Sequence, residues 1–125
     1  MPSMHALSQA ELKLAEIIWA NNPIPTPELS EIAERTLGWK KTTTYTFLKR
    51  MADKGVVKRN NATVTALITR DEFFSGQSRN FVANTFDGSL PMFITSFYGG
   101  RKLTAAQAAE LKHLIEEHQE GGENG

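Results

Sequence analysis

The sequence predicts a mainly α-helical fold with one small β hairpin. Apolar residues recur at intervals of three and four along most of the chain, as they do on the buried face of a helix. Residues that cap or stop helices, among them Ser8, Gly38 and Thr104, flank these stretches. One region, residues 56–69, is instead rich in β-branched residues around a turn. The chain contains no cysteine, so it forms no disulfides. With 125 residues it can bury a core without them.

Two helices are expected in the first third of the chain. The first opens with a capping box formed by Ser8 and Glu11 and stops before Pro23. Its inward face is expected to carry Leu12, Ala15, Ile18 and Trp19. Residues 23–25 must be extended, because each proline restricts the residue before it. Thr26 is then expected to cap the second helix, which ends at Gly38.

A third helix is expected over residues 42–54. The helical periodicity predicts that four residues point inward, namely Thr44, Phe47, Leu48 and Met51. The opposite face carries hydroxyl and basic side chains, among them Thr42, Thr43, Tyr45, Thr46, Lys49 and Arg50. Threonine is a poor helix former, so three in succession are unusual on a merely solvated surface. Such residue types can read base edges and phosphates.

The hairpin is expected to pair residues 56–60 with residues 63–69 around an Asn60-Asn61-Ala62 turn. Lys58 and Arg59 lie near its tip. Three helices followed by a ribbon, with a basic and polar third helix, form the winged variant of the helix-turn-helix. We therefore expect a DNA-binding domain over residues 1–70.

Residues 71–120 are expected to form three helices that bring two chains together. Six of the seven phenylalanines follow residue 72, more aromatic surface than three short helices can bury alone. A second copy related by a two-fold axis is the expected partner, and packing onto the first three helices is the alternative. The expected contact residues are Phe74, Phe81, Phe86, Phe93, Phe97, Leu111, Leu114 and Ile115. Residues 121–125 are expected to form a disordered tail.

The net charge is zero, but the positive charge is concentrated in one segment. Residues 37–59 hold seven of the 14 basic residues and a single acidic one. A polyanion such as DNA is the natural partner of this segment, although charge alone also fits a solvated face without a partner. On the DNA reading, phosphates are expected to contact Lys40, Lys41, Lys49, Arg50, Lys58 and Arg59. Trp19 and Trp39 are expected to be core and packing residues of the fold.

Several classes of protein are disfavoured by what the sequence lacks. No phosphate-binding glycine loop or nucleophile elbow is present, so neither catalysis nor a cofactor is expected. His113 and Glu117 have the spacing of metal ligands, but a solvated pair is the simpler interpretation, and no metal site is expected. The chain shows no signal peptide, and its longest uncharged run, residues 88–100, is too short to span a membrane. A cytoplasmic protein without membrane insertion is expected.

Seven short runs stand in a characteristic order. They are residues 7–11 (LSQAE), 17–19 (IIW), 38–39 (GW), 42–51 (TTTYTFLKRM), 54–55 (KG), 87–90 (DGSL) and 103–104 (LT). Together they resemble the penicillinase-repressor family of bacterial regulators, over nearly the whole chain. The resemblance implies a homodimeric transcriptional repressor that binds a palindromic operator. It places the recognition helix at residues 42–51, the wing at residues 56–69 and the dimerisation region at residues 72–117.

The sequence departs from this family in two places. Family members usually carry a basic residue where this chain has Thr42, and here the basic character lies at Lys40 and Lys41. The preferred operator is therefore expected to differ. The copper-responsive branch carries a C-terminal cysteine cluster, and the absence of cysteine excludes thiolate copper sensing here.

The resemblance also implies a way to release the operator. In the penicillinase branch, a membrane-bound sensor protease that responds to β-lactams cleaves the dimerisation region. Counted back from residues 103–104, the cleavage position falls between Ser96 and Phe97, where the family usually has asparagine before the phenylalanine. Cleavage there is a hypothesis. The alternative to a repressor is a winged-helix module that binds an acidic protein, which would show no preference among duplex sequences.

Overall fold

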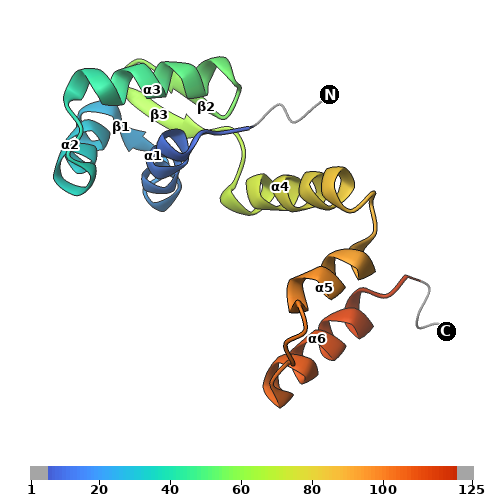
Figure 1. Cartoon of the computed structure of the whole chain (residues 1–125). Coiled ribbons are helices and arrows are strands. Elements are labelled where there is room, and N and C mark those ends of the chain that lie inside the picture. Colours follow the sequence, from blue (N-terminus) through green and yellow to red (C-terminus); the bar gives the residue numbers. More distant parts are fainter. Residues whose placement is uncertain (1–5, 121–125) are drawn as a thin grey trace. The chain divides into compact units, whose positions relative to one another are not determined.

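The computed structural model describes residues 6–120, so the expected tail lies outside the described residues (Figure 1). The elements in chain order are α1 (Gln9–Ala20), β1 (Ile24–Pro25), α2 (Thr26–Leu37), α3 (Lys41–Asp53), β2 (Val57–Asn60), β3 (Thr63–Ala66), α4 (Arg70–Thr85), α5 (Leu90–Tyr98) and α6 (Ala105–His118). The predicted fold class, mainly helical with a hairpin, is confirmed. None of the described helices is long and apolar enough to cross a membrane.

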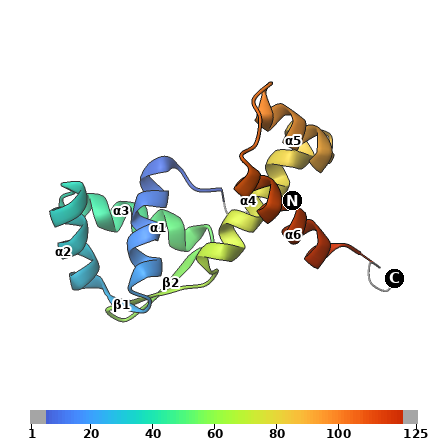
Figure 2. The same ribbon diagram turned by 90° about the horizontal axis from the view of Figure 1, so that it is seen from below.

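The chain divides into two compact units, Met1–Phe81 and Val82–Gly125. The boundary falls within α4, eleven residues beyond the functional boundary expected at residue 70. The first three turns of α4 therefore pack with the first unit. In Figure 2 the strands of this unit run along the lower edge of the group formed by α1, α2 and α3.

The core of the first unit joins the three helices to the sheet. Its buried members are Leu14, Ala15, Ile18, Ile24, Leu29, Ala33, Leu48, Met51, Val56, Val57 and Val64. The predicted face of α1 is partly wrong, because Leu14 and Glu11 are buried in place of Leu12 and Trp19. Those two side chains are only half-buried, at the edge of the core.

Two of the expected signals at the ends of α1 and α2 are confirmed, and one is wrong. At α1 the backbone N–H of Ser8 donates to Glu11 Oε1 at 2.8 Å, and that of Glu11 donates to Ser8 Oγ at 3.1 Å. Gly38 ends α2 with φ of 72°. Thr26 does not cap α2, since Pro25 is the cap residue and Thr26 is the first helical residue. Its N–H donates to the carbonyl of Ala62, in the hairpin turn, at 2.6 Å.

The sheet has three antiparallel strands in the order β1-β3-β2. The hairpin is confirmed, with Asn61 in its turn at φ of 60°. The second strand ends at Ala66, three residues earlier than expected. The short strand β1 adds to the hairpin, because Ile24 pairs with Val64 of β3. The sequence did not predict this strand.

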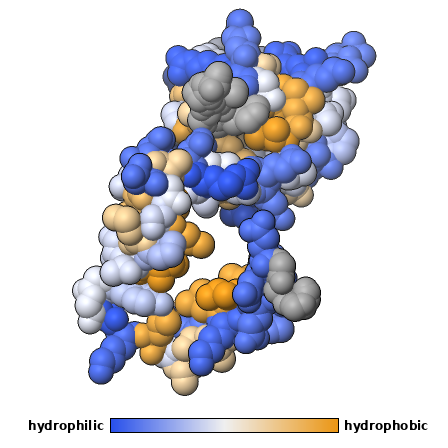
Figure 3. Space-filling model, turned by 90° about the vertical axis from the view of Figure 1, so that its right-hand side faces the viewer, coloured by the Kyte–Doolittle hydropathy of each residue, from blue (hydrophilic) through white to orange (hydrophobic). Residues whose placement is uncertain are grey.

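The helices of the second unit begin at well-formed caps. Thr104, expected to cap a helix, forms a capping box with Gln107 at α6, and the hydroxyl of Ser89 accepts from the N–H of Met92 at α5. Within residues 82–120, however, no side chain is buried. Figure 3 shows the resulting apolar surface, in orange, open to solvent.

Candidate nucleic-acid interface

Helix α3 carries the predicted functional face. Thr44, Leu48 and Met51 are buried and fix the rotation of the helix on the core. Phe47, also expected to point inward, is half-buried and packs against Trp39 with ring centroids 5.1 Å apart. The predicted outward residues are exposed at Lys40, Lys41, Thr42, Thr46, Lys49 and Arg50, and half-buried at Thr43 and Tyr45.

Tyr45 joins the helix to the ribbon. The Lys41 ammonium lies 5.7 Å from the centroid of the Tyr45 ring, and the Arg59 guanidinium carbon lies 5.3 Å from it. Both distances are in the range of cation–π attraction, which holds a cation near the ring face without neutralising its charge. We call Lys41, Tyr45 and Arg59 the basic-aromatic cluster. It places two positive charges from different elements on one tyrosine.

The ribbon separates the two basic residues that were expected together. Successive side chains of a strand point to opposite faces, so Arg59 shares a face with Val57 and Lys58 takes the other. The register agrees, because Arg59 pairs with the buried Val64 and Lys58 pairs with Thr65. Of the two, Arg59 is the one that contacts α3 through Tyr45.

The threonines of α3 have three different roles. The hydroxyl of Thr46 donates to the carbonyl of Thr42 at 2.9 Å, within the helix. Its lone pairs can still accept a hydrogen bond from outside. Thr44 is fully buried, and within the described chain its hydroxyl has no hydrogen-bond partner. The exposed Thr42 and half-buried Thr43 stand at the start of the helix, where backbone N–H groups also favour an anion.

The remaining cations of the segment differ in their availability. Lys49 forms an exposed pair with Asp53 at 3.5 Å, and Arg50 lies over the ring of Phe47 at 5.1 Å. Exposed contacts of this kind are weak and can be exchanged for phosphates. Lys54 is committed to the core region, because its ammonium donates to Glu11 Oε1 and to the carbonyl of Ala6 at 3.0 Å.

The Glu11 carboxylate is 2% exposed and is held by this lysine. Burial alone would raise the pKa of Glu11, but the hydrogen bonds from Lys54 and Ser8 outweigh it and lower the pKa below its usual value. The ion pair therefore stabilises the fold, and Lys54 is a cation of the basic segment that serves structure.

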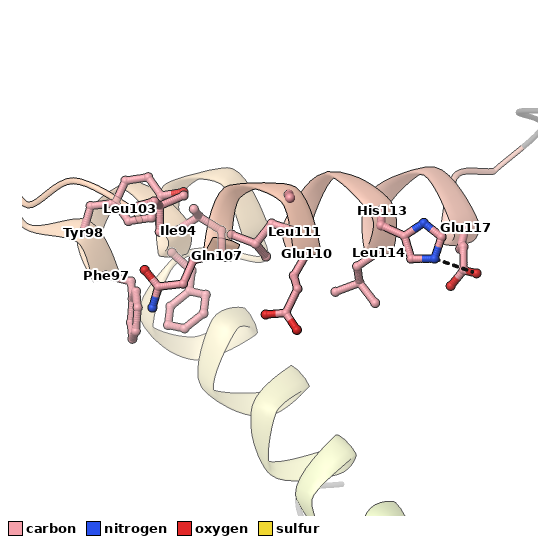
Figure 4. Close-up of a pocket in the computed structure, with 12 residues that line it drawn as sticks. Ile94, Phe97, Tyr98, Leu103, Gln107, Glu110, Leu111, His113, Leu114 and Glu117 are labelled. Carbon is pink, nitrogen blue, oxygen red and sulfur yellow. Dashed lines mark ion pairs between the residues drawn. The ribbon is translucent and has the colours of Figure 1, made fainter. Parts of the chain in front are cut away.

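The second unit contains an apolar groove between α5 and α6. It has a volume of about 830 Å³ and is lined by Phe93, Ile94, Phe97, Tyr98, Leu103, Gln107, Ala109, Glu110, Leu111, His113, Leu114 and Glu117. Figure 4 shows Phe97, Glu110 and Leu114 projecting toward the same open side. His113 pairs with Glu117 at 3.2 Å, and the described residues contain no cluster of three metal-binding side chains.

The groove brings together four of the eight predicted contact residues, Phe93, Phe97, Leu111 and Leu114. Phe86 packs against Phe93 at 5.7 Å between ring centroids, and Phe81 and Ile115 are exposed. Phe74 lies in the first unit, 6.3 Å from the Trp19 ring. Sequence reasoning missed its neighbour Phe73, which is 5% exposed, because the helical spacing counted from Phe74 passed over it.

Three helices, a ribbon and an exposed polar face on the third helix define a winged helix-turn-helix protein. Residues 7–117 match the penicillinase repressor family, and the chain belongs to that family. The penicillinase repressor of Bacillus licheniformis is 25% identical over 122 residues, which cover 94% of this chain and 95% of the relative. The solution structure of the DNA-binding domain of the repressor BlaI is similar to this chain, with a TM-score of 0.50 and 29% identity. That match covers 58% of this chain and 93% of the BlaI domain.

Proposed function

We propose that this protein is a homodimeric transcriptional repressor that acts in the cytoplasm and binds a palindromic DNA operator through α3 of each copy. The observation that carries the proposal is the basic-aromatic cluster, in which Lys41 and Arg59 meet on Tyr45. A helix and a ribbon that present cations side by side suit a duplex, whose phosphates line both sides of a groove. Membership of a family of repressors supports the same function.

The proposed DNA-contacting residues of α3, of Lys40 before it and of the ribbon divide by chemistry into two groups. The cations, which neutralise phosphates and set affinity, are Lys40, Lys41, Lys49, Arg50, Lys58 and Arg59. The hydroxyl residues, which read base edges or the thymine methyl, are Thr42, Thr43, Tyr45 and Thr46. Losing a cation should therefore weaken binding to all sequences alike, while losing a base contact should cost about 1–3 kcal/mol of discrimination.

The proposed dimer follows from the exposed apolar surface of the second unit. Phe97 is 70% exposed, Ile115 61% and Leu114 52%. Contiguous apolar surface of this kind marks an interaction site, and a two-fold dimer covers it with the same patch of a second copy. The groove between α5 and α6 would then receive side chains from the partner.

The test measures binding to duplexes selected from a random-sequence pool, by fluorescence anisotropy between about 50 and 200 mM salt. We expect a preferred duplex and an affinity that falls steeply with salt. Arg59→Ala and Lys49→Ala should reduce the salt slope by about one each and weaken all duplexes similarly. Lys102→Ala removes an exposed cation from the second unit and should change neither quantity.

Equal affinity for every duplex and no salt dependence would instead favour the protein-interaction module. If Arg59→Ala and Lys49→Ala leave the salt slope of the affinity unchanged, Arg59 and Lys49 are not phosphate contacts.

Release by proteolysis between Ser96 and Phe97 is the proposed induction step, which a membrane-bound sensor protease would carry out. Both residues lie in the last turn of α5, which ends at Gly99 with φ of 56°. A terminal turn opens more readily than a helix interior, so a protease can extend it for cleavage. Incubation with the candidate sensor protease should yield a fragment that begins at Phe97, as measured by mass spectrometry. Intact protein under those conditions would reject this step.

A further inference from the structure

The start of α4 is bound to α1 by a two-point ion pair. Arg70 Nε donates to Glu16 Oε1 at 2.8 Å, and Arg70 Nη2 donates to Glu16 Oε2 at 3.2 Å. Because two parallel bonds join two planar groups, this pair fixes an orientation as well as a distance. The guanidinium carbon also lies 4.8 Å from the centroid of the Phe74 ring.

Aromatic packing adds a second attachment one turn along. Trp19 of α1 lies 5.7 Å from Phe73 and 6.3 Å from Phe74, and the two phenylalanine rings meet edge to face at 5.1 Å. The Trp19 indole N–H donates to the carbonyl of Ile68 at 3.0 Å, so the segment before α4 is held too. We call Glu16, Trp19, Arg70, Phe73 and Phe74 the α1–α4 clamp.

The length of α4 converts a small rotation at its start into a large displacement at its end. A helix of 16 residues such as α4 is about 24 Å long, so a rotation of about 10° at its start moves its end by about 4 Å. One base pair rises about 3.4 Å along the duplex. A small change in the direction of α4 therefore displaces its far end by about the rise of one base pair.

We propose that the α1–α4 clamp is a positioning device, which sets the direction in which α4 leaves the DNA-binding unit and thereby the half-site spacing that the dimer reads. This inference rests on the proposed function. Its residues act through α4 and touch no base. Exposed ion pairs contribute little to folding stability, so the bidentate geometry of Arg70 is better explained by orientation than by stability.

The experiment uses the full chain and a panel of duplexes with two selected half-sites at spacings that differ by single base pairs, together with a single half-site duplex. Wild type should prefer one spacing. Arg70→Ala should keep the single half-site affinity within about twofold, yet lose up to about 10²-fold at the preferred spacing, because simultaneous engagement is what the geometry provides. The paired exchange of Glu16→Arg with Arg70→Glu should restore the preference.

Arg79→Ala is the matched control, because Arg79 lies on the same helix and bonds within it, to Ser75. It should behave as wild type. If Arg70→Ala keeps the wild-type spacing profile, or weakens single and paired half-sites equally, the inference is overturned and the clamp is structural only. Wild type that binds no duplex at all would overturn the proposed function and the inference with it, so the two failures are distinguishable.

Discussion

The two compact units of this chain differ in what they bury. In the described part of the first unit, residues 6–81, twelve hydrophobic side chains are buried, from Leu14 to Phe73. In residues 82–120 none is buried, although Phe97, Leu114 and Ile115 are large and apolar. Both units contain helices with sound caps, so local helix signals do not explain the difference.

Under the proposed function, the difference separates a domain that buries its own core from a unit whose apolar surface is covered by a second copy. A fully buried large apolar side chain contributes about 1.5–3 kcal/mol to stability, and the first unit obtains this contribution within one chain. The second unit lacks this contribution within one chain. Its stability should then depend on protein concentration, as in obligate dimers.

The largest expected effect contrasts the same substitution in the two units. Leu48→Ala should cost the first unit about 2–5 kcal/mol at any protein concentration, because Leu48 is 0% exposed in the core. Leu114→Ala should instead weaken self-association and change stability only where the dimer dissociates. Urea unfolding at several protein concentrations checks both. A concentration-independent loss in Leu114→Ala would remove the contrast between the units.

A smaller effect tests the ion pair of Glu11 and Lys54 in the first unit. Glu11→Ala should cost about 1–3 kcal/mol, because it removes a capping partner and leaves Lys54 without its carboxylate. Since folding lowers the pKa of Glu11, its stabilisation is complete above about pH 4.3 and is lost as the pH falls through the lower folded value. Thermal unfolding between about pH 2.5 and 6 should show this acid loss in wild type and a reduced loss in Glu11→Ala. The control is Glu28→Ala, because Glu28 is an exposed glutamate of α2.

The smallest effect concerns the buried hydroxyl of Thr44. Within the described residues this hydroxyl makes no hydrogen bond, so Thr44→Val should raise the unfolding free energy by about 1 kcal/mol. Operator affinity should stay unchanged, because Thr44 faces the core. Thr42→Val, on the exposed face of the same helix, should leave stability nearly unchanged and lower sequence discrimination. Lower stability in Thr44→Val would show that the hydroxyl is satisfied.

Signals that span a few residues were predictable from the sequence. The capping pairs at Ser8 and Thr104 and the stop at Gly38 were predicted correctly, because each depends on neighbours within about four residues. Pairing over long separations was not predictable. Ile24 pairs with Val64, forty residues away, and Lys54 pairs with the buried Glu11, 43 residues away.

The candidate site shows the same limit. Periodicity correctly predicted that Thr42, Thr46, Lys49 and Arg50 are exposed on α3, whereas Thr43 and Tyr45 are half-buried. It could not show that Arg59 reaches Tyr45, because this contact depends on how the ribbon lies against α3. Nor could it assign Phe74, whose neighbour Trp19 lies 55 residues earlier in the chain.

Sedimentation equilibrium of the full chain beside a fragment of residues 1–85 tests the contrast between the units most directly. We predict that the full chain is a dimer, which Phe97→Glu converts to a monomer, and that the fragment is a folded monomer. A full chain that remains monomeric at every concentration, with a second unit that is nonetheless stably folded, would contradict the account.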